Sequence, residues 1–400
     1  MKLEKKIGVV IGASKDAVHT IKKAKEAGVY IFALDGNPEA DGFAYADEKV
    51  VVDISKQEEV SKKVAEIQPD FIIPVPIGRY LSTTGYINDK FHLKGATYKA
   101  TELSTDKYLF HQTLQENNLR NVQLYLINND TSIYEVNIPY PAILKPRFGS
   151  GSRDVFYITN DKELSDVIHA VSINSEDFVL EEAVQGEEYG VDGAVIGGEL
   201  KLILIRKKMI TPLPIRQAIA SFSIPKKGEN NQRLWKTVEE HLKQVVKALK
   251  YDDCLINADI IVNNDGIFVI EIAPRPSGHN LHNVFVPLST GIDMAEEYIK
   301  FLSEKFYKFE TEDVRCMQIR FFDFENVIIN KIPQIDELKQ NPDCNIVIWN
   351  CSITKGEKMN KVTNGHSIMG RGFFIVEGKD EEDLIRQSEW ILNQFEVEEI

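Results

Sequence analysis

Apolar and polar positions alternate in a regular way over the first quarter of the chain. Continuous apolar runs predict strands over residues 7–14, 29–35, 49–54 and 70–76, and amphipathic segments predict helices over 17–27 and 58–67. Continuous apolar strands joined by such helices are typical of a parallel sheet covered on both faces. We therefore predict an α/β domain over residues 1–104.

The pattern then changes to strands separated by glycine turns. Ser104-Thr105-Asp106 supplies a cap for a helix over 107–116, and a longer helix is expected over 233–249. Hairpins are predicted over 141–158, over 189–206 with its turn at Gly197-Gly198, and over 256–273, together with a strand over 178–184. Residues 105–305 form the second predicted domain.

Short strands and a helix over 381–393 follow Lys305, which predicts a small α+β domain over residues 306–400. A chain of 400 residues, 43% hydrophobic and 27% charged, has the composition expected for two or three globular domains. The predicted fold class is thus α/β and α+β, with a parallel-sheet domain first.

Charge and cysteine usage exclude several classes of protein. The formal net charge of -14 argues against recognition of nucleic acid, because such proteins concentrate Lys and Arg. The four cysteines form no C-x-x-C pair, which fits neither a disulfide framework nor a zinc site. No apolar stretch is long enough to span a membrane. We expect reduced thiols, a cytoplasmic location and no membrane partner.

The hairpin around Asn263 to Gly266 carries the most informative pair of residues. If Asn263 and Ile267 flank a three-residue turn, Asp259 lies directly opposite Glu271. Opposed carboxylates repel each other unless a cation lies between them, and hard oxygen ligands suit Mg²⁺. The alternative is a solvated sheet face with the register one residue off.

A glycine-rich turn follows a strand that ends at Lys145. Gly149, Ser150, Gly151 and Ser152 form a flexible turn whose backbone N–H groups are able to approach phosphate oxygens, with Lys145 as the matching charge. The G-x-x-x-x-G-K-[ST] spacing of a P-loop is absent. An ordinary hairpin loop is the alternative interpretation.

The end of the next strand offers groups suited to a nucleoside. Glu181 to Val184 end the strand, where free backbone groups can bind a purine edge, and Glu188 lies one loop later, where it can accept from ribose hydroxyls. Taken alone, this signal is weak, because Glu-rich strand ends are usually just solvated.

The order of these features resembles the ATP-grasp superfamily. Lys107 on a helix, Lys145 with its glycine loop, Glu181 to Val184 with Glu188, and Asp259 and Glu271 twelve residues apart follow one another along the chain. The resemblance covers nearly the whole chain. The first domain resembles the pre-ATP-grasp domain, the second the ATP-grasp domain, and the third the C-terminal domain of the biotin-carboxylase-like branch.

The resemblance implies a role for each matching residue. It implies that Lys107 and Lys145 hold ATP phosphates under the loop Gly149 to Ser152, that Glu181 and Val184 contact adenine, and that Glu188 binds ribose. It further implies that Asp259 and Glu271 bind Mg²⁺, with Mn²⁺ as an alternative, and that Arg275 contacts the substrate or its acyl phosphate. A guanidinium fork suits that last role.

One departure from the family pattern concerns the metal site. Many family members carry Asn two residues after the second acidic ligand, whereas this chain has Ala273. The sequence E-I-A-P-R-P, followed by Gly278 and His279, is similar to the corresponding sequence of purine-pathway members of the family, which also have alanine at this position. The family pattern survives, and the number of bound metal ions stays open.

Several other residues have a plain structural explanation beside the functional one. Arg79 lies at the end of the fourth strand, where α/β sheets bind ligands, and is a weak substrate-site candidate. His279 and His282 are candidates for substrate contact or for a structural role. The run Arg206-Lys207-Lys208 reads as solvated charge, although its first residue could face the ATP cleft. G-x-G-x-x-G is absent, which disfavours a nicotinamide-binding enzyme.

The resemblance implies an ATP-dependent ligase. A carboxylate attacks the γ-phosphate, and an amine then captures the acyl phosphate, with Lys145 and Arg275 offsetting the developing charge. The small-molecule acid and amine stay unnamed, and a homodimer is left open. The alternatives are a phosphoribosylglycinamide-synthetase-like enzyme of purine biosynthesis, a bicarbonate-dependent carboxylase, and an ATP-binding partner or sensor protein. The absence of a biotin carrier segment favours an organic acid over bicarbonate.

Overall fold

The fold begins with a four-stranded parallel sheet. The computed structural model describes residues 5–120, 122–128, 131, 136–149, 154–170, 176–212, 216–362, 368 and 370–400. The sheet has the order β3-β2-β1-β4, with strands β1 (Ile7–Ile11), β2 (Tyr30–Asp35), β3 (Glu48–Val51) and β4 (Phe71–Ile72). The expected parallel sheet is therefore present.

Helices cover this sheet as the apolar runs require. They are α1 (Val18–Glu26), α2 (Gln57–Ile67), α3 (Leu81–Phe91) and α4 (Tyr98–Thr105). Val10 and Ile31 are fully buried in one core cluster, and Val9 and Leu34 in another. Because neighbouring strand residues point to opposite faces, both faces of the sheet are buried.

A small antiparallel sheet follows, after helix α5 (Lys107–Glu116). Asp106 caps α5 by accepting from the backbone N–H groups of Tyr108 and Leu109, each at 3.1 Å. The sheet has the order β5-β8-β6-β7, with β5 (Leu124–Ile127), β6 (Ala142–Pro146), β7 (Phe156–Ile158) and β8 (Phe178–Glu182), and α6 (Asp161–Ala170) lies beside it. The predicted hairpin of β6 and β7 is present.

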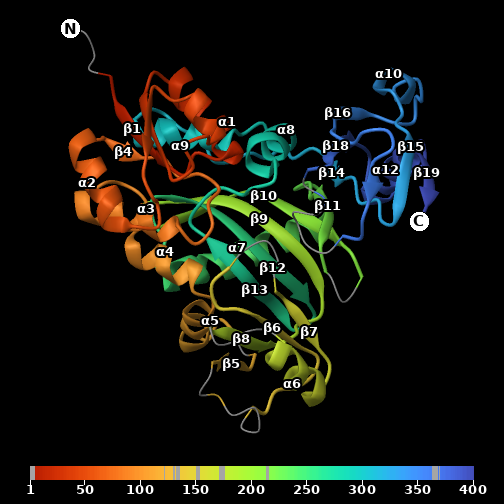
Figure 1. Ribbon diagram of the computed structural model, residues 1–400, viewed down its shortest axis with the longest axis horizontal. Helices are drawn as coiled ribbons and strands as arrows, with labels where there is room; N and C mark the ends of the chain where they lie inside the picture. The colour runs from red at the N-terminus through yellow and green to blue at the C-terminus, as the bar shows by residue number, and fades with distance from the viewer. Residues whose placement is uncertain are drawn as a thin grey trace.

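The largest element is an eight-stranded sheet that runs through the middle and the C-terminal part of the chain (Figure 1). Its order is β13-β12-β9-β10-β11-β14-β18-β16. The first five are β9 (Glu187–Ile196), β10 (Glu199–Ile210), β11 (Ala218–Ser223), β12 (Cys254–Asn263) and β13 (Gly266–Ala273). Helix α7 (Glu229–Ala248) begins four residues before the predicted start at residue 233.

The C-terminal segment shares this sheet. Strands β14 (Met317–Phe321), β16 (Ile346–Cys351) and β18 (Gly372–Glu377) extend it through the pairing of β11 with β14. A second sheet combines β15 (Val327–Lys331), β17 (Lys358–Met359) and β19 (Glu396–Glu399), with α10 (Ile335–Leu338) and α12 (Glu381–Leu392) nearby. The predicted α+β character of residues 306–400 is seen, although their strands are continuous with the central sheet.

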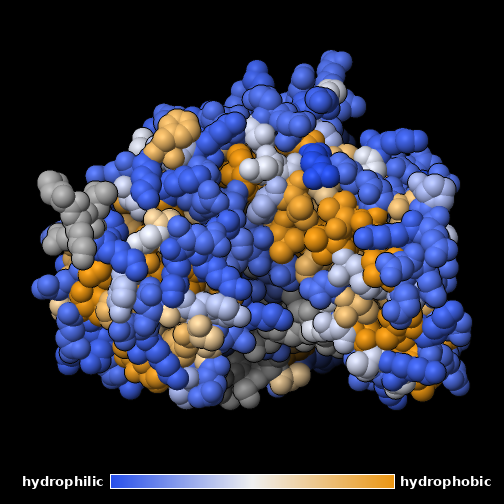
Figure 2. All heavy atoms as spheres, turned by 90° about the horizontal axis from the view of Figure 1, so that it is seen from above, coloured by the Kyte–Doolittle hydropathy of each residue, from blue (hydrophilic) through white to orange (hydrophobic). Residues whose placement is uncertain are grey.

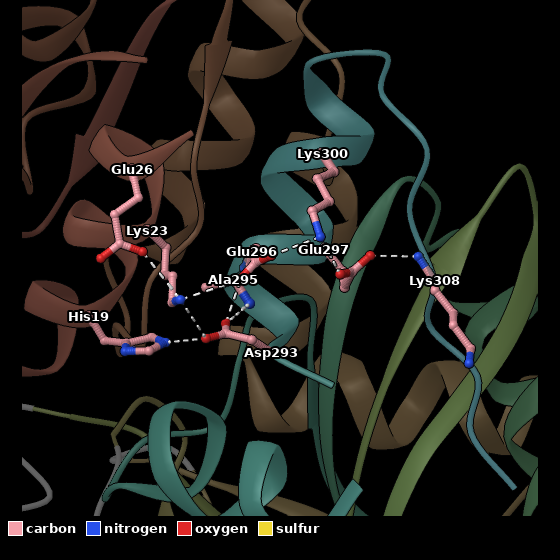
Figure 3. Close-up of polar contacts among 9 residues, drawn as sticks. All are labelled: His19, Lys23, Glu26, Asp293, Ala295, Glu296, Glu297, Lys300 and Lys308. Atoms are coloured by element: carbon pink, nitrogen blue, oxygen red, sulfur yellow. Dashed lines mark hydrogen bonds and ion pairs between the residues drawn. The ribbon is translucent and has the colours of Figure 1, made fainter. Parts of the chain in front are cut away.

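Polar contacts join the first sheet to the body of the molecule (Figure 3). A π-helix (Leu281–Phe285), α8 (Val286–Thr290) and α9 (Met294–Leu302) follow β13, and α9 lies against α1. His19 of α1 lies 2.8 Å from Asp293, and Lys23 lies 3.2 Å from Glu296. The loops that follow β1 and β4 lie beside the loop that follows β13, since Asp16 and Pro76 would lie 3.6 and 3.8 Å from a Cβ at Gly278.

The upper face of the molecule is covered mostly by polar side chains, with apolar side chains gathered in a few areas (Figure 2). Phe306, with 90% of its surface exposed, is the most exposed large apolar side chain among the described residues.

Within the same residues, no helix has the length and apolar character needed to cross a membrane. The homodimer stays a prediction.

Candidate functional site

In the hairpin of β12 and β13, Asp259 pairs with Glu271 as predicted, but the turn that produces this register differs from the predicted one. The turn contains two residues rather than three, because Asn263 pairs with Gly266. That register alone would place Asp259 opposite Ile270. A bulge between Val269 and Glu271 leaves Ile270 as the extra residue, so that Asp259 pairs with Glu271 after all.

The two opposed carboxylates have different surroundings. Asp259 is largely covered, with 24% of its side chain exposed, and its Oδ2 lies 2.5 Å from Nζ of Lys208 on β10. Glu271 is exposed and makes no hydrogen bond or ion pair with any residue in the described part of the chain. One carboxylate is neutralised by a lysine, and the other is free to accept a cation.

A buried ion pair lies beside them on the same sheet. Arg206 donates from Nε to Asp192 at 2.8 Å and from Nη2 to Oδ1 of Asn257 at 3.3 Å. A Cβ at Gly190 would lie 2.1 Å from Nη1 of Arg206, so only glycine leaves room for the guanidinium. Arg206 therefore belongs to a buried ion pair rather than to an open cleft, and Lys208 is the residue of that run that reaches the acidic pair.

Lys145 lies in a second buried cluster, centred on Glu181. Oε1 of Glu181 lies 2.5 Å from Nζ of Lys145, and Oε2 lies 2.7 Å from Arg120 and 3.0 Å from His111. Burial alone would raise the pKa of Glu181, but Lys145, His111 and Arg120 hold it well below its usual range. Burial lowers the pKa of His111 to about 3, so its ring is neutral at pH 7.

The charges of this cluster do not cancel. Lys145 and Arg120 are cations, Glu181 is the one anion, and neutral His111 contributes a hydrogen bond but no net charge. One positive charge is left over in a buried environment. Such a site favours an approaching anion, because the anion replaces solvation that burial has removed.

Lys107 and Gly149 meet at the edge of a pocket. Nζ of Lys107 donates to the carbonyl oxygen of Gly149 at 2.8 Å, and the backbone N–H of Lys107 donates to Arg147 at 3.1 Å. Burial lowers the pKa of Lys107, and the charge of Glu271 works against that shift. The first turn of α5 is thus tied to the start of the glycine-rich loop.

The pocket lies where the first sheet, α5 and the acidic hairpin meet. Its empty volume is about 660 Å³, which includes space open to solvent. Lining residues include Arg79 from the loop after β4, Lys107, Gly149, Asn257, Glu271 and Arg275. Five residues chosen from separate parts of the sequence, namely Arg79, Lys107, Gly149, Glu271 and Arg275, therefore line one space.

Arg275 lies two residues after the end of β13, where the charges of several carboxylates act on it. Burial lowers the pKa of its guanidinium, and Glu271, Asp259, Asp16 and Asp192 oppose that shift. Its Nη1 donates to the backbone oxygen of Pro276 at 2.8 Å. A guanidinium keeps its charge in proteins, so a poorly solvated Arg275 favours an anionic ligand in the pocket.

Other predicted residues in the described part of the chain are not among those that line the pocket. Glu188 on β9 forms a close ion pair with Arg216, and Val184 is half-buried in the connection between β8 and β9. His279 is exposed in a left-handed backbone conformation at φ 58°. Ser150, Gly151 and Ser152 lie outside the described residues.

Sequence reasoning missed several residues of this region. His111 is four residues after Lys107 on α5, and Asn257 is two residues before Asp259 on β12, so helix and strand periodicity would have placed each on the same face as its partner. Arg120, Asp192 and Lys208 carry no comparable local signal. Their positions depend on which strands and helices become neighbours.

One protein-family model matches the central part of the chain. Residues 138–283 match the family model described as ATP-grasp domain. The chain is also 23% identical over 281 residues to the carbamoyl phosphate synthase large chain of Thermoanaerobacter sp. (strain X514). That match covers 68% of this chain and 26% of the relative, so the chain spans about a quarter of that protein.

Solved structures match the whole chain at low sequence identity. The L-amino acid ligase from Bacillus licheniformis is 17% identical with a TM-score of 0.81, and the match covers 100% of both chains. The phosphoribosylglycinamide synthetase from Anaerococcus prevotii is 18% identical with a TM-score of 0.72, covering 99% of this chain and 100% of the other. The predicted fold is confirmed by these neighbours.

Proposed function

Because residues 138–283 form an ATP-grasp domain within a chain that has the fold of ATP-grasp enzymes throughout, we propose that this protein is an Mg-ATP-dependent ligase. It activates a carboxylate as an acyl phosphate and transfers the acyl group to an amine, with release of ADP and phosphate. The observation that carries the proposal is the pocket that brings Lys107, Gly149, Glu271 and Arg275 together.

ATP phosphates are held, in this proposal, between α5 and the glycine-rich loop. Lys107 and Gly149 line the pocket, and Lys145 lies in the buried cluster with one excess positive charge. Catalysis of phosphoryl transfer depends mainly on positioning and on charge neutralisation. Glu181 and Val184 on the adenine side and Glu188 on the ribose side complete the nucleotide site that we propose.

Asp259 and Glu271 have the chemistry that Mg²⁺ requires. Two carboxylates face each other across one ladder, and Glu271 makes no hydrogen bond or ion pair with any of the described residues. Mg²⁺ binds through one or two protein carboxylates together with phosphate oxygens, and when bound it neutralises charge on those phosphates. We propose that Glu271 and Asp259 hold this ion, with Lys208 neutralising Asp259 when no ion is present.

The acid substrate is proposed to lie between Arg275 and the loops of the first sheet. Arg275 offers a guanidinium to the carboxylate, and Arg79 lines the same pocket from the loop after β4. Oδ2 of Asp16 would lie 3.6 Å from a Cβ on Gly278, which places it beside the loop that follows Arg275. A space flanked by both signs of charge suits an organic acid that also carries an amino group.

Bicarbonate is the second candidate for the activated acid. The curated relative is a carbamoyl phosphate synthase, and biotin carboxylases share the fold. Bicarbonate has no side chain to occupy a pocket that reaches from Arg275 to Arg79, which favours the organic acid. The same fold in an L-amino acid ligase is consistent with that preference.

The test supplies candidate organic acids with Mg-ATP and hydroxylamine in buffer stripped of carbon dioxide. Formation of a hydroxamate in step with ADP release is the expected result, and Arg275→Lys should reduce it strongly because a lysine cannot form the bidentate contact. Activity that appears only when bicarbonate is restored would assign the carboxylase function instead. Nucleotide protection without turnover of any acid would point to a binding protein.

A further inference from the structure

Four side chains occupy two neighbouring rows on one face of the sheet. Asp259 pairs with Glu271, and Asn257, two residues earlier on β12, pairs with Ala273. Residues two apart on a strand point to the same face, and directly opposed residues have Cβ atoms about 4.5–5.5 Å apart. Asn257 therefore lies next to the opposed carboxylates. The pairs from Asn257 to Asp259 share one register, because the bulge comes after Asp259.

Asn257 also faces the pocket. Asn257, Glu271 and Ala273 all line it, so the amide and the free carboxylate share one space. The residue opposite Asn257 is an alanine, whose methyl group leaves the space over this row open. No other oxygen-bearing side chain occupies these two rows between β12 and β13.

The amide oxygen of Asn257 keeps capacity for a further partner. It accepts one hydrogen bond from Nη2 of Arg206 at 3.3 Å, which is long for such a bond. Arg206 already has a stronger partner in Asp192, at 2.8 Å from Nε. Because an amide oxygen has two lone pairs, one remains for a ligand.

We propose that Oδ1 of Asn257 is a third protein ligand of the divalent cation held by Asp259 and Glu271. This inference rests on the proposed function, since it concerns the same metal site. Amide carbonyl oxygens are hard ligands that bind Mg²⁺ and Mn²⁺ together with carboxylates. The third ligand comes from β12, while the position across the ladder on β13 holds only a methyl group.

The cross-strand arrangement provides a sharp test. Moving the amide from one side of the row to the other, in the double variant Asn257→Ala/Ala273→Asn, keeps an oxygen donor on the same face. The assay is binding of Mn²⁺ alone. It is monitored as the decrease in the electron paramagnetic resonance signal of the free ion, and it needs no acid, amine or turnover. The apparent Kd for Mn²⁺ should rise about tenfold in Asn257→Ala, an effect of about 1.4 kcal/mol.

The double variant should bind Mn²⁺ within about threefold of the wild type, because opposed positions lie side by side. Asn257→Asp should bind Mn²⁺ more tightly, since it adds a charge at the same place. Asn264→Ala, in the exposed turn of the same hairpin, is the matched control and should have no effect. Circular dichroism of each variant checks that the sheet is folded.

The proposal fails if folded Asn257→Ala binds Mn²⁺ as the wild type does, or if the double variant is as weak as the single one. The second result would mean that Asn257 acts only through its bond to Arg206. Loss of binding in Asn257→Ala with recovery in the double variant supports the ligand role even if no acid substrate is turned over. Absence of Mn²⁺ binding in the wild type, with and without ADP, would overturn this inference and the proposed metal site together.

Discussion

Replacing Glu181 by Gln tests the physical basis of the buried cluster around Lys145. The change keeps the size of the side chain and removes the one negative charge that Lys145 and Arg120 share. Both cations are buried, with 5% and 6% of their surfaces exposed, so neither can be solvated by rotating outwards without disturbing the core. The variant therefore contains two buried cations without a counter-charge.

Removal of one partner from a buried ion pair destabilises a protein by about 3–5 kcal/mol. We expect Glu181→Gln to lower the free energy of unfolding by this amount, which corresponds to a fall in Tm of roughly 10 °C for a domain of this size. Glu182→Gln is the control. Glu182 is the next residue on β8, half-buried and without a side-chain partner in the described part of the chain, so its change should stay within about 0.5 kcal/mol.

The effect of pH follows from the direction of the pKa shift. The pKa of Glu181 in the folded protein lies well below the usual 4.5, despite burial, because of Lys145, His111 and Arg120. As the pH falls below about 4.5, the unfolded chain binds a proton at this position before the folded protein does, and stability is lost. The difference in free energy of unfolding between the wild type and Glu181→Gln should therefore shrink progressively below pH 4.5. It should be fully present well above that value.

Urea and thermal unfolding of the three proteins between pH 3.5 and 8 provide the measurement. A difference of less than about 1 kcal/mol between the wild type and Glu181→Gln at pH 7 would refute the reasoning, as would an equal effect of Glu182→Gln. An advantage that persists unchanged at pH 3.5 would show that the charge of Glu181 is not its source.

Three further outcomes are expected from the site. Mg-ATP should raise the Tm of the wild type, and Lys145→Ala or Glu271→Ala should reduce that shift, measured by scanning fluorimetry; an undiminished shift in both would remove the nucleotide assignment. Lys208→Met should strengthen Mn²⁺ binding in the absence of nucleotide, because the lysine no longer competes for Asp259, and calorimetric titration that finds weaker binding would contradict this. Gly190→Ala should destabilise the protein by at least about 2 kcal/mol in urea unfolding, because its Cβ would overlap the guanidinium of Arg206, whereas Gly370→Ala, at a position with open space and no left-handed backbone, should have the smaller effect.

Strong periodic signals predicted the elements accurately. The helix after Ser104-Thr105-Asp106 runs from Lys107 to Glu116 as expected, because its cap and its apolar face are both local features. Helix α7 begins four residues early, at Glu229, since the polar first turn carries no apolar periodicity to mark its start. Helix ends are the least determined by local sequence.

The acidic hairpin shows where local reasoning reaches its limit. Asp259 and Glu271 were expected to face each other across a three-residue turn, and they do so across a two-residue turn with a bulge at Ile270. Without the bulge, the two-residue turn would place Asp259 opposite Ile270, so the pairing of Asp259 with Glu271 depends on the bulge and was not determined by the local pattern. The placement of the bulge depends on how β13 packs at the edge of its sheet.

Motif order along the chain predicted the ATP-grasp domain that residues 138–283 match, whereas the roles of the individual site residues stay predictions. Hydrophobic periodicity is a local property, so the sequence by itself predicted many of the strands and helices, although it did not predict helices α3, α4 and α6 or strand β11. The partners of the charged groups were decided only by the tertiary structure. Lys145 meets Arg120 and His111, and Asp259 meets Lys208, through contacts between elements far apart in sequence. Burial and pairing of charges depend on which elements become neighbours, and no local pattern encodes that choice.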